Sequence, residues 1–176
     1  MINPSGKAML IIDLQNDYFP GGGFPLWNTE QTVANILTAM QTAKEKEIQI
    51  IHVQHIADPS LGLSPFFNKG SEGANIHPEI LAAAPYAPIV VKSFADSFVD
   101  TDLESTLQRL GVNEILVCGM MTQNCVTHTA ISKHAEKYKS AILPDCSTTV
   151  SEMLHLIALH AVSTRMALVP SMQALS

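Results

Sequence analysis

The chain has few charged residues and no basic stretch, and each scarcity excludes a class of protein. Charged residues make up 15% of its 176 residues, against about a quarter in typical globular proteins. Apolar residues make up 47%, which excludes a disordered chain, because this composition can bury a sizeable core. The net charge is -6 and no arginine-rich run occurs, which argues against a nucleic-acid partner.

The sequence also has no long apolar run and few cysteines. Every apolar run soon meets a charge or a proline, so we expect no membrane span. Residues 1–15 hold an apolar run too short for the core of a signal peptide. The three cysteines, at 118, 125 and 146, form no C-x-x-C pair, which predicts neither a disulfide framework nor a structural zinc site. We therefore expect a cytoplasmic protein.

The low charge bears on association as well. A small domain with so little polar surface is expected to place apolar surface against another subunit. Aromatic residues near the glycine-rich segment 19–27 favour the same interpretation. We expect a homodimer or homotetramer, with a small-molecule substrate and neither nucleic acid nor membrane as partner.

Short apolar runs alternate with segments of helical periodicity along the whole chain. Strands are predicted over residues 7–12, 48–53, 88–91, 114–117, 140–143 and 166–169. Helices are predicted after Asn28 as a cap, over 101–111 and 123–137, and from Thr149 to 161, the second and the last opened by Thr-x-x-Glu capping boxes. Residues 54–87 form a long loop with one helical turn near 79–83, a length typical of functional loops or lids.

This alternation predicts a single α/β domain over residues 1–176. Strands separated by helices favour a mostly parallel, doubly wound, six-stranded sheet covered on both faces, with strand order 3-2-1-4-5-6. In such sheets ligands bind beyond the carboxyl ends of the strands, where the order reverses between strands 1 and 4. Residues at these strand ends are therefore the first candidates for a site.

Three candidate catalytic residues lie at those strand ends. Asp13 follows the first strand, Lys92 follows the third, and Cys125 lies in the first turn of the helix after the fourth. A helix N-terminus and a nearby lysine favour the thiolate, and Asp13 can take the thiol proton. Each residue alone has an ordinary structural explanation, as a turn residue, a solvated lysine or a core cysteine. Their joint placement favours covalent acyl transfer.

Four segments, in order along the chain, resemble the isochorismatase-like cysteine hydrolases. Residues 13–19 match the D-x-Q-x-D opening with its following F, and residues 67–78 match F-x-x-G-S-x-G-x-x-I-H-P. Residues 92–103 match K-x4-S-F-x-x-T-x-L, and residues 119–130 match G-x-x-T-x-x-C-V-x-x-T-A. The resemblance implies an α/β/α three-layer fold and an Asp13–Lys92–Cys125 triad.

The resemblance also implies a reaction, the hydrolysis of an amide or similar C–N bond through a Cys125 thioester. Asp13 would deprotonate the thiol and pass the proton to the leaving amine, while Lys92 stabilises the charge. Backbone N–H groups of Met121 and Cys125 would hold the oxyanion. Because both N–H groups must point at one place, and because the resemblance implies the same isomer, the Met120–Met121 peptide bond is predicted to be cis.

The chain departs from the family pattern where substrates are selected. Nicotinamidases carry a metal-binding D-x-H pair after strand 2, whereas this chain has His52 within the strand and His55 at its end, without that pair. His52 is interpreted as a sheet histidine, and one further histidine makes a poor metal site. We therefore expect no metal and no cofactor, and nicotinamidase activity is disfavoured. Phe19, Trp27 and His55 are predicted to bind substrate.

Three alternative functions stay open at this point. One is a catalytically idle, oligomeric binding or redox-sensing protein, although an intact triad argues against it. Another is an isochorismatase acting on an enol ether, which the presence of Cys125 disfavours. The third is a flavodoxin-like binder, which lacks support because no G-x-G-x-x-G follows the first strand. The remaining side chains of interest are expected to be structural or at the core edge: Cys118, Cys146, His128, His134, His155 and His160.

Overall fold

The computed structural model describes residues 5–176 and contains one six-stranded parallel sheet. Residues 1–4, part of the stretch considered for a signal peptide, lie outside the described range. The sheet order is β3-β2-β1-β4-β5-β6, as predicted, and every neighbouring pair is parallel. The strands are β1 (Lys7–Ile12), β2 (Gln49–His55), β3 (Ile89–Lys92), β4 (Glu114–Met120), β5 (Lys139–Thr148) and β6 (Ala167–Leu168).

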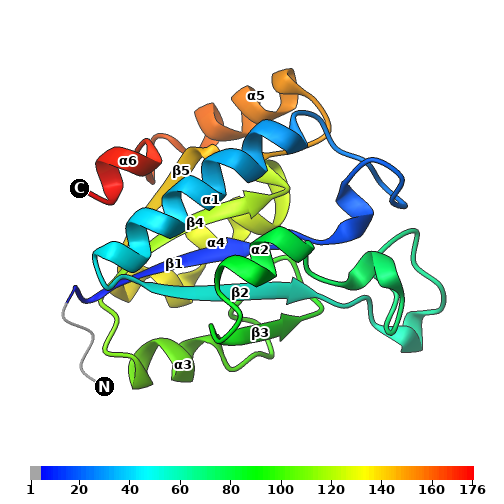
Figure 1. Cartoon of the computed structure of the whole chain (residues 1–176), viewed down its shortest axis with the longest axis horizontal. Coiled ribbons are helices and arrows are strands. Elements are labelled where there is room, and N and C mark those ends of the chain that lie inside the picture. The colour runs from blue at the N-terminus through cyan, green and yellow to red at the C-terminus, as the bar shows by residue number, and fades with distance from the viewer. Residues whose placement is uncertain (1–4) are drawn as a thin grey trace.

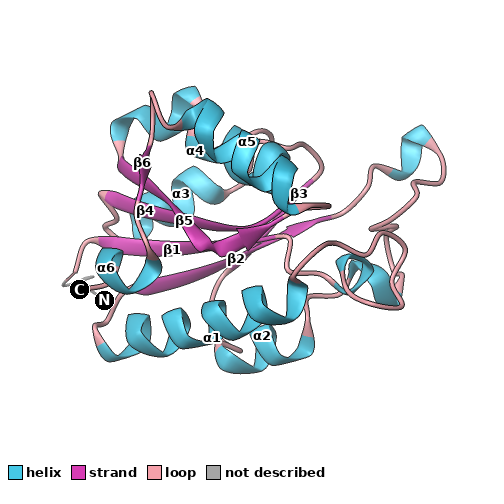
Figure 2. Ribbon diagram, turned by 90° about the horizontal axis from the view of Figure 1, so that it is seen from above, coloured by secondary structure: helices cyan, strands magenta, loops and turns pink. Residues whose placement is uncertain are grey.

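Helices cover both faces of the sheet and give three layers (Figures 1 and 2). One layer contains α1 (Thr29–Glu45), α2 (Pro78–Ala83) and α6 (Ser171–Ala174). The other contains α3 (Leu103–Arg109), α4 (Thr127–Ala130) and α5 (Glu152–Val162). The predicted three-layer, doubly wound fold is confirmed.

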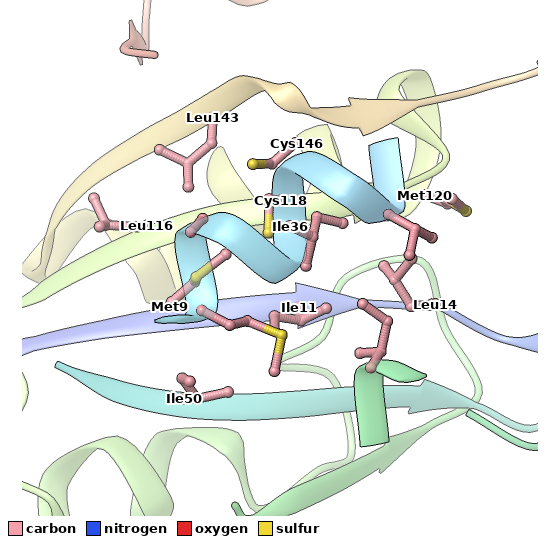
Figure 3. Close-up of a cluster of buried hydrophobic side chains, with 14 of the residues drawn as sticks. Met9, Ile11, Leu14, Ile36, Ile50, Leu116, Cys118, Met120, Leu143 and Cys146 are labelled. Atoms are coloured by element: carbon pink, nitrogen blue, oxygen red, sulfur yellow. The ribbon is translucent and has the colours of Figure 1, made fainter. Parts of the chain in front are cut away.

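Alternate residues of each strand enter one of two apolar cores. In β1, Met9 and Ile11 pack toward α1, while Leu10 and Ile12 pack on the opposite face. Figure 3 shows the first of these cores, in which the side chains of β1, β2, β4 and β5 meet those of α1. Within residues 5–176 no helix combines the length and apolar character needed to cross a membrane.

The predicted helix over residues 123–137 is wrong. The structure has a π-type turn over Thr122–Val126, then the short α4, then a 3-10 turn over Lys133–Lys137. Ser132 separates the last two, because its side chain accepts a hydrogen bond from the N–H of His134 and so starts a new turn. Local capping therefore overrides the helical periodicity here.

The fifth strand is longer than predicted. The predicted strand ends at residue 143, but the chain re-pairs with β4 after a shift in register between Val117 and Gly119. Cys146, expected in a loop, consequently lies within β5 and in the apolar core. The pairing partner, which the local sequence does not reveal, decides where this strand ends.

Three helix caps also differ from the predictions. The first residue before α3 is Asp102, and the hydroxyl of Thr101 accepts from the N–H of Leu103 rather than closing a capping box with Glu104. Asn28 occupies the position before α1, but its side chain caps nothing, and the hydroxyl of Thr32 donates to its carbonyl instead. α5 is capped by Ser151, which accepts from the N–H of Leu154, rather than by Thr149. The Thr-x-x-Glu pattern thus placed the start of α5 two residues too early.

Candidate active site

The carboxyl ends of β1, β3 and β4 bring the three candidate catalytic residues together. Lys92 Nζ lies 3.1 Å from Asp13 Oδ2 and 3.2 Å from Cys125 Sγ. Relative exposures are 0% for Asp13, 1% for Lys92 and 3% for Cys125. A carboxylate, an ammonium and a thiol are therefore in mutual contact in a nearly closed site, where electrostatic interactions are stronger than in water.

Two further acceptors complete the surroundings of the lysine. Lys92 Nζ lies 2.8 Å from Nδ1 of His55, the last residue of β2, and 3.1 Å from the carbonyl oxygen of Phe94. Since an ammonium can only donate, Nδ1 of His55 accepts and the ring proton is on Nε2. Burial, followed by the charge of Lys92, lowers the pKa of His55 and keeps its ring neutral.

Backbone geometry at the ends of β1 and β4 lets these groups approach. Gly119 has φ +123°, and a Cβ there would lie 2.0 Å from the carbonyl oxygen of Ile12. Only glycine fits between the two strands at this point. Asp13 itself adopts φ 55°, a left-handed conformation that is uncommon outside glycine and turns the chain sharply after β1.

The turn that carries Cys125 follows directly on β4. The Met120–Met121 peptide bond is cis, as predicted. The carbonyl of Met121 accepts hydrogen bonds from the N–H groups of Asn124 and Val126, which closes the turn around Cys125. Thr122, at its start, lies 2.7 Å through Oγ1 from Nδ1 of His155 on α5. His155 is thus a buried link between α5 and the turn Thr122–Val126, which we call the nucleophile turn.

The expectation that the surroundings favour a thiolate is wrong. Burial, and then the Asp13 carboxylate, raise the pKa of the Cys125 thiol, while Lys92 lowers it only in part. Burial also disfavours the charged form of Lys92, but the Asp13 carboxylate and the hydrogen bonds to Asp13 and Cys125 outweigh it and leave the pKa of Lys92 above its ordinary value. The free protein therefore holds a neutral thiol beside an Asp13–Lys92 ion pair.

Asp13 has one oxygen available to a proton. Its Oδ2 lies against Lys92, whereas its buried Oδ1 accepts no hydrogen bond from any part of the chain between residues 5 and 176. Ligand atoms of Asp13, His55 and Cys125 all lie within 4.8 Å of one another. The unpartnered Oδ1 is the natural acceptor for the thiol proton.

Asp13, His55 and Cys125 are also the described residues whose donor atoms could together hold a metal ion. Lys92 Nζ, however, already lies 2.8–3.2 Å from an atom of each of them. A charged ammonium on all three donors repels a cation and takes the electron pairs that a metal would need. These donors therefore suit an ammonium better than a metal ion.

Residues that the sequence had not singled out hold the site in shape. The side-chain amide of Gln15 bonds to both the N–H and the carbonyl of His55, each at 2.8 Å. The carboxylate of Asp17 accepts the N–H groups of Gly23 and Phe67, at 2.9 and 2.7 Å. Both belong to the D-x-Q-x-D segment, which was the available signal, but their partners lie too far along the chain for the sequence to indicate.

Asp17 helps to place an aromatic cluster beside the triad. Tyr18 packs edge-on against Phe67, with ring centroids 4.6 Å apart, and Phe66 lies 5.1 Å from Phe67 and 5.0 Å from Phe24. Burial, and then the charge of Asp13, raise the pKa of Tyr18. Phe67 in turn lies 5.9 Å from His55, measured between ring centroids, which places this cluster next to the residue that contacts Lys92.

The predicted substrate-binding residues lie in three different environments. His55 contacts Lys92 directly. Phe19 packs on His77, with ring centroids 4.4 Å apart, and lines a surface cavity beside α1. The Trp27 ring lies near that of His155, with centroids 6.2 Å apart, and His155 in turn contacts Thr122.

Comparisons with known proteins agree with this geometry. The chain is 35% identical over 147 residues to the isochorismatase family protein YddQ of Bacillus subtilis, which covers 83% of this chain and 80% of that protein. It is 26% identical over 176 residues to the nicotinamidase/pyrazinamidase of Mycobacterium tuberculosis, covering 90% and 95% of the two chains.

A solved structure shares the whole fold. The crystal structure assigned as an isochorismatase hydrolase of Oleispira antarctica superposes with a TM-score of 0.88 at 27% identity, over 99% of this chain and 98% of that one. The family model described as the isochorismatase domain matches residues 7–174. The chain therefore belongs to the isochorismatase family of hydrolases.

Proposed function

We propose that this chain is a cysteine amidohydrolase that cleaves a C–N bond, amide or ureido, in a small molecule through a Cys125 thioester. The observation that carries the proposal is the contact of Lys92 Nζ with both Asp13 Oδ2 and Cys125 Sγ, at 3.1 and 3.2 Å. A nucleophile, a base and a fixed cation within reach of one another are the groups that acyl transfer needs.

The resting protonation states define the first step. The thiol is neutral, so it must lose its proton as it attacks, and Oδ1 of Asp13 is free to take it. The sulfur bonds to the substrate carbonyl carbon, and the carbonyl electron pair moves to oxygen. Lys92 remains an ammonium and stabilises the negative charge that passes between carboxylate, sulfur and substrate.

The second half of the cycle returns the proton. Asp13 gives it to the leaving nitrogen as the C–N bond breaks, which releases an amine or ammonia and leaves the thioester. Water then adds to the thioester and Asp13 accepts its proton. The carboxylic acid product departs as the proton returns to the thiol. The N–H groups of Met121 and Cys125, on the turn that follows β4, are proposed to hold the oxyanion in both halves.

The relative from Mycobacterium tuberculosis supports a carboxamide as the substrate class, since its name gives nicotinamide and pyrazinamide. We propose that the present chain needs no metal, because Lys92 occupies the point among Asp13, His55 and Cys125. Tyr18, Phe66 and Phe67 are proposed to form the apolar wall of the pocket, with Trp27 at its edge. The cytoplasmic location expected from the cysteine content stays a prediction.

A panel of small carboxamides and ureido compounds tests the proposal. Ammonia release is followed in a coupled assay, and the acid product is identified by mass spectrometry. We expect turnover of at least one compound and, in acid-quenched samples, a Cys125-containing peptide carrying the acyl group. Turnover that persists in Cys125→Ala, or a panel without any hydrolysis, would contradict the proposal.

A further inference from the structure

The ammonium of Lys92 faces one acceptor more than it has protons. Nζ lies 2.8 Å from Nδ1 of His55 and 3.1 Å from Oδ2 of Asp13. It also lies 3.1 Å from the carbonyl oxygen of Phe94 and 3.2 Å from Sγ of Cys125. An ammonium has three protons, and Lys92 is only 1% exposed, so these contacts with protein atoms account for all of them. Three protons are therefore shared among four acceptors.

The four acceptors differ in how closely they are tied to the lysine. The Asp13 carboxylate carries the opposite charge and forms an ion pair with it. Phe94 follows Lys92 by two residues in the same loop, so its carbonyl stays close to the ammonium. The ring of His55, on β2, and the sulfur of Cys125, on the nucleophile turn, have neither tie. These two are the acceptors that compete for the third proton.

The fold fixes the position of His55 beside the lysine. The two residues are partners in the register between β2 and β3, which places their side chains next to each other. Gln15, which is fully buried, bonds to both the N–H and the carbonyl of His55 at 2.8 Å. Burial, and then the charge of Lys92, lower the pKa of His55, so Nδ1 stays an acceptor.

The sulfur of Cys125, in contrast, becomes a stronger acceptor as it loses its proton. A thiol sulfur accepts hydrogen bonds weakly, whereas a thiolate accepts a charge-assisted one. A hydrogen bond that Lys92 gives to Sγ is one that Nδ1 of His55 loses. The thiolate therefore gains less from the ammonium than it would without the histidine.

We propose that His55 is a positioning residue that acts through Lys92, because its Nδ1 competes with Sγ of Cys125 for the third ammonium proton and so limits the reactivity of the thiol in the free protein. No covalent bond of the ammonium breaks, since only the acceptor of one N–H changes. The effect is to protect the nucleophile from electrophiles other than the substrate. The inference takes from the proposed function only that Cys125 is the reactive thiol.

Alkylation of Cys125 by iodoacetamide tests the inference without a substrate. His55→Asn keeps an acceptor, because Oδ1 of asparagine takes the place of Nδ1, and His55→Leu has the same shape without an acceptor. At neutral pH we expect Cys125 to react about tenfold faster in His55→Leu than in His55→Asn, the effect of one hydrogen bond to a charged group. Equal rates, or faster reaction in His55→Asn, would overturn the proposal.

Two controls separate this effect from changes in folding and access. Cys118 and Cys146 are fully buried, so their labelling in the same samples reports unfolding and should be equally slow in both variants. In a background of Lys92→Met with Asp13→Asn, which removes the ammonium and its buried counter-charge together, the two substitutions of His55 should give equal rates. A difference that persists there would mean that His55 does not act through Lys92, and would reject the proposal.

A third variant covers the case in which His55→Leu does not fold. The amide of glutamine lies one bond further out, at the place of Nε2, so His55→Gln also lacks an acceptor at the place of Nδ1. Cys125 should react as fast in His55→Gln as expected for His55→Leu, and a rate equal to that of His55→Asn would contradict the proposal. A panel of amides without hydrolysis would leave all these rates unaffected, so the two proposals fail separately.

Discussion

Cys118 and Cys125 are close in sequence and almost equally buried, yet their surroundings have little in common. Cys118 lies inside β4, where its neighbours in the apolar core include Cys146 and Leu143 (Figure 3). Cys125 lies just past the end of the same strand, against Lys92 and Asp13. Burial raises the pKa of both thiols, and it raises that of Cys146 to about 12. Burial alone therefore does not distinguish a reactive thiol from a structural one.

The difference lies in what the neighbours can do with a proton and a charge. Beside Cys125, the free Oδ1 of Asp13 can take the proton and Lys92 can stabilise the anion. The Cys118 thiol instead donates to the carbonyl oxygen of Leu10, 3.5 Å away, which can accept a hydrogen bond but cannot take up the proton. Chemistry is thus expected at the strand end and packing in the strand middle.

Removing each thiol in turn should give the largest contrast. Cys125→Ala is expected to lose turnover by about 10⁴-fold or more, because the covalent pathway is eliminated. Cys118→Ala should keep its turnover, because no group of the triad contacts that side chain. Steady-state ammonia release on the best substrate of the panel measures both. Similar losses in the two variants would remove the distinction between the two cysteines.

Replacing Lys92 should give the next largest effect, and a second substitution at Asp13 should restore the stability of the protein without restoring its activity. Lys92→Met leaves the buried Asp13 carboxylate without its partner, and we expect a loss of about 3–5 kcal/mol in the free energy of unfolding together with loss of activity. Lys92→Met combined with Asp13→Asn should recover most of that stability, since no buried charge remains, but no activity. Urea denaturation and the amide assay report the two effects. An active double variant would contradict the proposed roles.

Alkylation should rank the three thiols in the folded protein. Iodoacetamide is expected to modify Cys125 before Cys118 and Cys146, because Asp13 and Lys92 can support its transient thiolate while the other two thiols lie in the apolar core. Peptide mapping after partial modification identifies the labelled residue. Earlier labelling of Cys118 or Cys146 would mean that access, rather than charge, decides reactivity.

Raising the pH into the alkaline range should lower the free energy of unfolding because of the buried thiols. The pKa of Cys118 is raised above the ordinary 9.0, so the unfolded chain releases that proton first and stability falls as pH rises above this value. Each such thiol should remove about 1.4 kcal/mol of unfolding free energy per pH unit. Cys118→Ala should start less stable at pH 7, by about 0.5–3 kcal/mol, and lose less on raising the pH. If the free energy of unfolding fell equally steeply with pH in the wild type and in Cys118→Ala, this prediction would be wrong.

Chelation should give the smallest effect of all. Because Lys92 contacts Asp13, His55 and Cys125, the described residues whose donor atoms could together hold a metal, activity is expected to be unchanged after treatment with EDTA. The assay is the same ammonia release, with and without added zinc. Loss of activity that zinc or iron restores would show that His55 and Asp13 hold a metal during turnover, and that Lys92 then lies elsewhere.

The sequence predicted the fold because the signals for it are local. Continuous apolar runs separated by helical periodicity indicate parallel strands whatever the rest of the chain does. The order of the strands then follows from the preference for right-handed crossovers. Predictions failed where a local pattern competed with a distant partner, as in β5, where pairing with β4 carries the strand past Pro144.

The same distinction between local and distant signals applies to the candidate site. Asp13, Lys92 and Cys125 could be selected from the sequence, since each follows a strand and strand ends meet at one edge of a parallel sheet. Their protonation could not be predicted, because a helix N-terminus favours the thiolate whereas burial opposes it. Only the packing around Cys125 decides between the two effects.

What the sequence alone determined is therefore the sheet, its order and the three residues at its carboxyl edge. The tertiary structure decided that Phe19 packs on His77, that His55 contacts Lys92, and that α5 leaves an apolar face uncovered. The physical reason is the separation along the chain of the residues that take part. Periodicity and strand ends are properties of a few consecutive residues, whereas these contacts join loops and helices that only the folded chain brings together.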